Sequence, residues 1–498
     1  MHYDMNKFIS RLTLFSCIII ISTAAVSNAQ QSKDLGTVTL QQCIDIAQDQ
    51  SAVANAARYD LIANRWQFES YNADLLPSLS LTGDAPNYDK SIFPNVQDNG
   101  QVTFSSRTQS EASASLSVTQ NILPTGGTLS LSTGITRLGI FEGENTYLWQ
   151  STPMVLGFSQ PIFQFNNLKW RSKTEPLRYE IAQKEFVQEM ENIAQRVTQQ
   201  FFDVYLAKIN LENAELNVTR NDSVYQISQG RYKVGSIAEN ELLQTELALR
   251  NAESALTTAR IEYERALNDF KILLGYPTDV ELDLKEPDNV PDISVNIEKA
   301  KQMALKNNSE SLNYRLNEIQ ADRNLAQAKS EARPGATLRV NYGLNQTSSA
   351  FSELYQNPEN RQFVSLGFEV PIFNWGKQTA QINAARNQQR EVDNSIQYER
   401  RQFMQKVEYT VSQFLQLRGQ VQLAAQADTI AQRRYEVAQN RYLIGKIDIT
   451  NLFIAQNEKD SARQAYIRAL RTFWTGWYDL RELTLYNFRE DKPITYDI

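Results

Sequence analysis

Residues 225–235 read YQISQGRYKVG and residues 435–445 read YEVAQNRYLIG, so one segment occurs twice in the chain. A second pair, LGFSQPIF at 156–163 and LGFEVPIF at 366–373, has the same offset of 210 residues. Two matches with one offset indicate an internal duplication. Each half is predicted to contain a short helix, a longer helix, a strand region, and two very long helices joined by a glycine-containing turn.

The boundary between the repeats lies at GYPTDVELDLKEPDNVP (275–291), which is rich in proline and aspartate and is predicted to be a loop. We expect the first repeat at 30–290 and the second at 291–498. The first should contain strands within 78–163 and a long helical hairpin at 167–274. The second should contain strands within 335–370, a long helical hairpin at 375–483 and a C-terminal tail.

Two stretches, from about Lys169 to Lys233 and from Lys377 to Leu443, contain almost no glycine or proline. A helix of ~60 residues is ~90 Å long, so it must pack lengthwise against its neighbours. The return arms carry apolar residues at the three- and four-residue steps of coiled coils. Their other faces are polar, which leaves two interpretations open: a solvated exterior, or the lining of a water-filled channel.

The strand regions alternate small polar with apolar residues, as in Ser113–Thr119 (SASLSVT) and Val364–Val370 (VSLGFEV). Such alternation is typical of strands with one apolar and one wet face. A β-sandwich and a sector of a membrane barrel both fit, and a secreted chain favours the barrel. Four to six strands cannot enclose a water-filled lumen, so we expect the chain to oligomerise.

Composition excludes several classes of function. The chain has one histidine, His2, and two cysteines, Cys17 and Cys43, and its net charge is −7. His2 and Cys17 fall in the predicted leader, so histidine-dependent catalysis, the usual zinc sites and an internal disulfide are not expected. The negative charge argues against nucleic-acid binding. We therefore expect no cofactor, no metal site and no enzymatic activity, with Cys43 a small buried residue.

Residues 1–29 are predicted to be a signal peptide. Lys7 and Arg11 precede an apolar run from Leu12 to Val26, and Ser27-Asn28-Ala29 fits a cleavage site. An N-terminal membrane anchor is the alternative, although the run is short for a span. Residues 14–17 (LFSC) faintly resemble a lipoprotein box, but Phe15 and the four isoleucines after Cys17 argue against it.

The chain resembles the TolC-like outer membrane efflux protein family over residues 37–485. The resemblance rests on the duplication, on Pro-Ile-Phe at 161–163 and 371–373, and on Arg-Tyr-x-x-Gly at 231–235 and 441–445. It implies a mainly α fold with a β membrane sector, in which three subunits close one outer-membrane β-barrel above a helical tunnel across the periplasm. The implied function is the passive exit duct of a tripartite efflux or type I secretion system. The implied partners are a homotrimer, a periplasmic adaptor (membrane fusion) protein, an inner-membrane pump of RND, ABC or MFS type, and outer-membrane lipid.

The resemblance also assigns roles to the turns between the long helices. It implies adaptor contacts at Arg231, Tyr232, Val234, Gly235, Ser236, Arg441, Tyr442, Gly445 and Lys446. It places a periplasmic gate at Glu241, Tyr442, Asn451, Phe453 and Ile454. Some family members have an aspartate ring where this chain has Asn451 and Ile454. We therefore expect closure through Phe453, Ile454 and a Tyr442–Glu241 hydrogen bond.

Two other functions remain as alternatives. A structural coiled-coil protein of the envelope, such as a stalk or adhesin without transport, would account for the long helices. It would not need strands with one apolar face. A carboxylate enzyme such as a glycosidase is permitted by the abundant aspartate and glutamate, but no motif pairs them.

Overall fold

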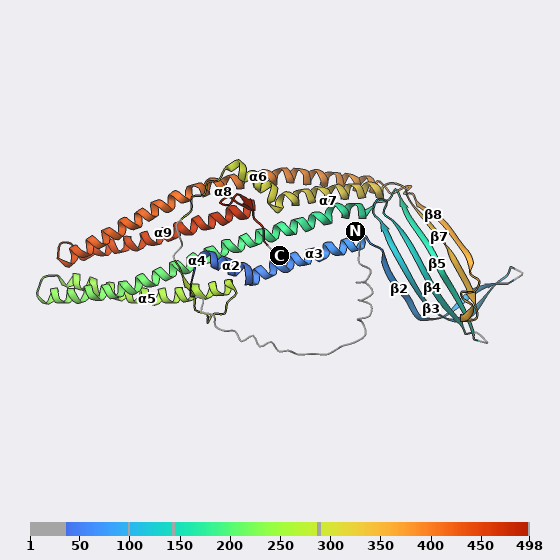
Figure 1. Cartoon of the computed structure of the whole chain (residues 1–498), viewed down its shortest axis with the longest axis horizontal. Coiled ribbons are helices and arrows are strands. Elements are labelled where there is room, and N and C mark those ends of the chain that lie inside the picture. Colours follow the sequence, from blue (N-terminus) through green and yellow to red (C-terminus); the bar gives the residue numbers. More distant parts are fainter. Residues whose placement is uncertain (1–35, 98–99, 142–144, 286–289, 497–498) are drawn as a thin grey trace.

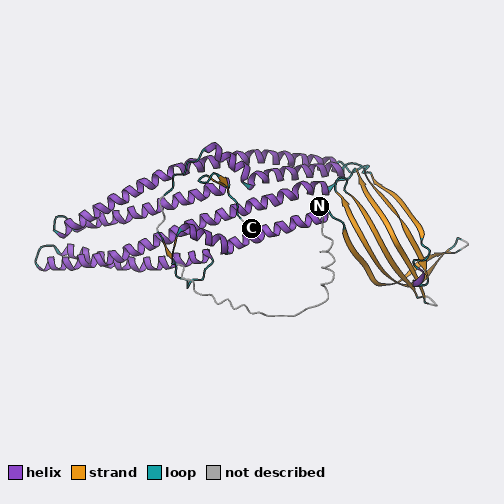
Figure 2. Cartoon of the chain, viewed as in Figure 1, coloured by secondary structure: helices purple, strands orange, loops and turns teal. Residues whose placement is uncertain are grey.

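The computed structural model describes residues 36–97, 100–141, 145–285 and 290–496. The predicted signal peptide at 1–29 lies outside the described residues. The molecule is elongated, with long helices over most of its length and one sheet at the end opposite the hairpin turns (Figure 1). Figure 2 shows the same separation of helices and strands.

The helices repeat along the chain with fixed offsets. The long helices α4 and α8 each have 67 residues, and the return helices α5 and α9 each have 36. In the first half the helices are α2 (Leu40–Gln50), α3 (Ala52–Asp74), α4 (Asn167–Lys233) and α5 (Glu239–Leu274). In the second half they are α6 (Ile297–Asn307), α7 (Ser309–Glu331), α8 (Lys377–Leu443) and α9 (Ile449–Thr484). The duplication read from the sequence is confirmed.

The helices pack lengthwise around an apolar core of their own. Helix α4 packs against both α5 and α9, which joins the two halves. Phe201 of α4 is edge-on to Phe270 of α5, with ring centroids 6.2 Å apart, and Phe414 of α8 contacts Trp477 of α9 at 5.8 Å. In the described part of the chain, no helix has the combination of length and apolarity that a membrane span requires.

The main sheet is antiparallel and has the order β2-β3-β4-β5-β7-β8. Four strands come from the first half and two from the second, so the β5–β7 pair joins the halves within the sheet. The strands are β2 (Ser78–Val96), β3 (Val102–Ile122), β4 (Gly127–Ile140), β5 (Thr146–Ile162), β7 (Gly335–Ser348) and β8 (Glu359–Glu369). A short 3-10 helix, η1 (Phe351–Glu353), lies in the loop between β7 and β8.

Two short pairings tie the chain segments near the middle of the molecule. Strand β1 (Thr37–Val38) pairs in parallel with β6 (Asp283–Leu284), which connects the N-terminal segment to the spacer between the halves. Strand β9 (Tyr486–Asn487) pairs antiparallel with β10 (Lys492–Pro493), so the segment after α9 folds back on itself.

Candidate functional site

The sheet has two chemically different faces, which the strand register defines. Directly paired residues across five strands form an apolar row of Leu79, Val118, Leu131, Leu156 and Tyr342. The row on the other side consists of Ser78, Thr119, Ser130, Gly157 and Asn341. We call the sides that carry these two rows the apolar face and the polar face.

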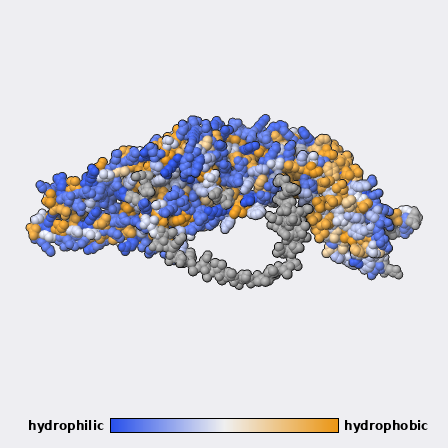
Figure 3. Space-filling view, viewed as in Figure 1, coloured by the Kyte–Doolittle hydropathy of each residue, from blue (hydrophilic) through white to orange (hydrophobic). Residues whose placement is uncertain are grey.

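Both faces of the sheet are open to the surroundings in the single chain. On the apolar face the exposed fraction is 73% for Leu81 and 77% for Phe368. Figure 3 shows hydrophobic residues gathered where the sheet meets the helices, whereas the helical part is mainly hydrophilic. An uncovered apolar face of this size marks contact with another molecule or with lipid.

The turns at the ends of the two hairpins have the same backbone geometry. Gly235 and Gly445 have φ angles of 73° and 72°, a conformation that glycine adopts without strain. The amide of Ser236 donates to the Arg231 carbonyl at 2.8 Å, and that of Lys446 donates to the Arg441 carbonyl at 2.8 Å. The repeated Arg-Tyr-x-x-Gly sequence therefore produces one turn twice.

The side chains of the two turns differ. Tyr232 is 42% exposed, whereas Tyr442 at the equivalent position is 1% exposed. The hydroxyl of Tyr442 lies 3.4 Å from the Ser228 hydroxyl. The Arg231 guanidinium lies 5.3 Å from the centroid of the Tyr442 ring and within 3.5 Å of the Tyr442 and Leu443 carbonyl oxygens. Arg231 therefore links the first hairpin to the turn of the second hairpin.

Tyr442 also belongs to a small apolar cluster behind the turn of the second hairpin. Its buried members are Tyr435, Tyr442, Ile449, Leu452 and Ala455. Within this chain the Tyr442 hydroxyl contacts Ser228 and not Glu241, which differs from the expected Tyr442–Glu241 hydrogen bond. The reason is that α8 turns Tyr442 toward α4, while Glu241 lies in the first turn of α5.

The other residues expected at the gate lie on the first turns of α9. Asp448 caps this helix by accepting from the Asn451 amide at 2.8 Å, and the Asn451 side chain donates to the same oxygen at 3.0 Å. Phe453 is half-buried against the cluster, and Ile454 is exposed. Of the residues expected to contact an adaptor, Arg231 is half-buried and Tyr442 is buried. The rest are exposed, namely Tyr232, Val234, Gly235, Ser236, Arg441, Gly445 and Lys446.

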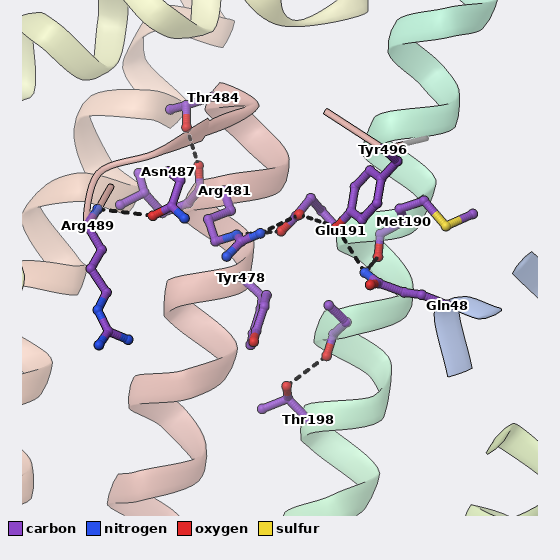
Figure 4. A network of polar contacts seen from close by, with 12 residues as sticks. Gln48, Met190, Glu191, Thr198, Tyr478, Arg481, Thr484, Asn487, Arg489 and Tyr496 are labelled. Atoms are coloured by element: carbon purple, nitrogen blue, oxygen red, sulfur yellow. Dashed lines mark hydrogen bonds and ion pairs between the residues drawn. The ribbon is translucent and has the colours of Figure 1, made fainter. Parts of the chain in front are cut away.

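A buried polar network lies near the middle of the molecule (Figure 4), and sequence reasoning missed it. Glu191 of α4 has a fully buried side chain and accepts two bonds of 2.7 Å from the guanidinium of Arg481 in α9. Tyr496 donates to the same carboxylate at 2.6 Å, and Gln48 of α2 donates to the Tyr496 hydroxyl at 2.9 Å. Burial is the main cause that raises the pKa of the Tyr496 hydroxyl. The network joins both halves and the C-terminal segment.

The described residues offer little to a metal or to redox chemistry. They contain no group of three or more His, Cys, Asp or Glu side chains arranged to hold a metal ion. Cys43 of α2 is buried, and burial raises the pKa of its thiol to about 12, so the thiol stays protonated at neutral pH.

A comparison with known protein families matches one segment in each half of the chain. A family model described as outer membrane efflux protein matches residues 128–276 and 300–484, more than half of the chain. A search of curated proteins finds no match.

Solved structures of low sequence identity share the fold. The CmeC outer membrane channel of Campylobacter jejuni has a TM-score of 0.65 at 15% identity, and the alignment covers 92% of this chain and 87% of that one. The outer membrane protein VceC of Vibrio cholerae has a TM-score of 0.63 at 13% identity, and the alignment covers 89% of this chain and 95% of that one. The open state of the MtrE outer membrane channel of Neisseria gonorrhoeae has a TM-score of 0.58 at 16% identity, and the alignment covers 89% of this chain and 88% of that one.

Proposed function

Because the chain belongs to the outer membrane efflux protein family, we propose that it is the exit duct of a tripartite efflux or type I secretion system. The protein lies in the outer membrane with a periplasmic helical extension, as its family does. In the proposal it is a passive homotrimeric channel. A periplasmic adaptor and an inner-membrane pump would supply the energy and the cargo.

The two-faced sheet is the observation that carries the proposal. Its apolar face suits lipid, and the serine, threonine, glycine and asparagine of its polar face suit a hydrated lumen. Six strands with two free edges, β2 and β8, cannot surround water alone. Three copies would bring about eighteen strands, a number that leaves an aqueous channel when a barrel closes.

The exposed turns of the two hairpins are the proposed adaptor contacts. Each turn presents exposed side chains around a glycine with little side-chain cover, so another backbone can approach closely. Three copies with two hairpins each would present six similar turns at the periplasmic end. Such repetition suits an adaptor that also binds in several copies.

The proposed gate is the contact between the two hairpins of each subunit. Arg231 and Ser228 hold the Tyr442 turn against α4, and Ile454 is exposed beside it. Opening would move the second hairpin away from the first, a two-state change in helix packing. Loss of the Arg231 contacts should favour the open state.

Conductance in a planar lipid bilayer tests the duct and its gate. We expect the purified protein to form channels that are mostly closed, and Arg231→Ala to raise the open fraction. Arg441→Ala is the matched control, because Arg441 occupies the equivalent position of the second turn and is exposed. Tyr442→Phe combined with Ile454→Ser should also raise the open fraction.

Two results would argue against the proposal. Equal conductance of the Arg231 and Arg441 variants would contradict the proposed role of Arg231 in the gate. Absence of any conductance from protein inserted in the bilayer would favour the alternative of a coiled-coil envelope protein or adhesin without transport.

A further inference from the structure

Arg137 of β4 lies on the apolar face of the sheet. Strands β3 and β4 pair without interruption from Ile122 and Gly127 to Gln109 and Ile140, so alternation along β4 is not reset. Arg137 therefore shares a face with Leu129 and Leu131. It stands eight positions beyond Leu129, roughly 26 Å along a strand at about 3.3 Å per residue.

On a strand tilted by about 40° that length is roughly 20 Å of height, so Arg137 lies toward the far border of the apolar band. An apolar band on a membrane-spanning sheet is about 25 Å tall and is bordered by aromatic residues. The turn that begins β4 lies on the helical side, where Gly126 packs against the side chain of Asn166, the residue that caps α4. Strand β4 runs from the helical side of the sheet to its far end (Figure 1), and Arg137 is three residues before the last residue of β4, Ile140.

Two aromatic rings hold the Arg137 guanidinium. It lies 4.4 Å from the centroid of Tyr147 and 5.5 Å from that of Trp149, which is its direct partner on β5. Trp149 is in turn edge-on to Phe351 of η1, with centroids 5.2 Å apart. Stacking uses the faces of the guanidinium and leaves its edge N–H groups free to donate.

The loop that carries η1 is fixed against the same face of the sheet. The hydroxyl of Ser151 donates to the Leu354 carbonyl at 2.6 Å, and Leu354 is buried. The Gln346 side chain donates to the Glu353 carbonyl at 2.8 Å. These hydrogen bonds therefore fix the loop that carries Phe351, the residue whose ring contacts Trp149.

The described strands carry all their carboxylates on the polar face, together with Arg107, Arg339 and Arg361, whereas Lys90 and Arg137 are on the apolar face. The carboxylates are Asp84, Asp89, Glu111, Glu359 and Glu369. The nearby loop residue Glu353 accepts a bond from the Ser348 hydroxyl at 2.7 Å. At the far end of the sheet the described strands therefore place only cations on the apolar face, and the Glu353 carboxylate of the adjacent loop lies on the same side, bonded to Ser348, the direct partner of Trp149.

From these observations we propose that Arg137, held by Tyr147 and Trp149, binds the phosphate of a lipid headgroup in the outer leaflet. The guanidinium fork binds phosphate through two parallel hydrogen bonds, and the two rings suit the boundary between headgroups and acyl chains. The inference rests on the proposed function, which places the apolar face in lipid and the helices in the periplasm.

Native mass spectrometry of the detergent-purified full-length protein tests the site. The probes are diphosphoryl lipid A and the same lipid with its phosphates removed. We expect the protein to prefer the phosphorylated lipid, and Arg137→Gln to weaken its binding about tenfold, since a charge-assisted bidentate pair is lost. Arg137→Lys should retain part of the preference because it keeps the charge.

Arg361→Gln is the matched control, because Arg361 is an exposed arginine on the polar face of the same sheet, directly paired with Gly343. It should bind both lipids as the wild type does. Unchanged lipid preference in Arg137→Gln would overturn the proposal. Displacement of the lipid by millimolar inorganic phosphate would also overturn it, because the site would then bind free phosphate.

Bilayer conductance of the same samples separates this inference from the proposed function. We expect Arg137→Gln to conduct as the wild type does. A wild type that conducts but shows no preference for the phosphorylated lipid refutes the lipid site alone, and a wild type that never conducts refutes the duct.

Discussion

The helical part of this chain buries many of its apolar side chains, whereas the sheet leaves many of its apolar side chains exposed. Phe201, Phe202 and Phe270 are buried between helices of one chain. Leu81 and Phe368 of the sheet stay exposed although they are as apolar as the helical core. The helical part therefore has its own hydrophobic core, whereas the sheet is held by backbone hydrogen bonds and leaves its apolar face to the surroundings.

The region in which a substitution lies should therefore decide which property of the protein it changes. A change in the helical part should alter the free energy of unfolding of the chain itself. In the proposed trimer, a change on the sheet should instead alter insertion and assembly, because lipid and neighbouring copies would complete its faces. Three substitutions test that division, in order of decreasing effect.

Glu191→Ala should be the most destabilising of these substitutions. It leaves the Arg481 guanidinium without its carboxylate in a mostly buried position, which costs about 3–5 kcal/mol. Urea unfolding of the detergent-purified protein, followed by helical circular dichroism, measures the loss. Glu253→Ala removes the exposed Arg250–Glu253 pair and should leave the urea midpoint unchanged. Equal midpoints for the two variants would show that the buried network contributes no more than a surface pair.

Leu131→Arg tests the apolar face of the sheet. An arginine that faces lipid costs about 2–4 kcal/mol at the midplane of the apolar band and about 0–1 kcal/mol near its borders, and Leu131, two positions beyond Leu129, should lie between these limits. The amount of protein recovered in the outer-membrane fraction measures insertion. Ser132→Arg is the matched control, since the next residue of β4 is on the polar face, and it should insert at wild-type levels. Should Ser132→Arg fail while Leu131→Arg inserts, the two faces have been assigned the wrong way round.

Glu482 of α9 should give the helical part a small dependence on pH. Burial is the main cause that raises the pKa of its carboxyl group, with Lys406 acting in the opposite direction. The folded state therefore holds this proton more tightly than the unfolded state does. The free energy of unfolding should fall as pH rises through the window between the ordinary and the raised pKa.

Urea midpoints from about pH 3 to about pH 8, which bracket the ordinary glutamate range, measure this effect. Glu482→Gln should make the profile less steep, because the amide cannot titrate, while other carboxyl groups with a raised pKa, such as Asp479, remain. A variant whose midpoints follow the wild type at every pH would show that Glu482 does not contribute.

The helices, turns and strands could be predicted because residues close together in the sequence determine them. The scarcity of glycine and proline in α4 and α8 predicts their length, and the repeated Gly235 and Gly445 turns predict where they end. The alternation around Ser113–Thr119 predicts strands with two different faces, and the register confirms them. Each of these signals depends only on neighbouring residues.

The remaining features could not be predicted because they depend on distant segments. Glu191 and Arg481 are 290 residues apart, and nothing near either residue indicates its partner. Tyr232 and Tyr442 have the same local sequence context, yet only Tyr442 is buried, because Arg231 and α4 cover it. A duplication predicts two equal structures but not how one copy packs on the other.

The number of chains in the detergent-solubilised particle, measured by native mass spectrometry, tests the proposed duct. One chain leaves the edges of β2 and β8 unpaired within its main sheet. We therefore expect a particle of three chains that requires detergent to stay in solution. A monodisperse single chain that remains soluble without detergent would contradict the proposed duct.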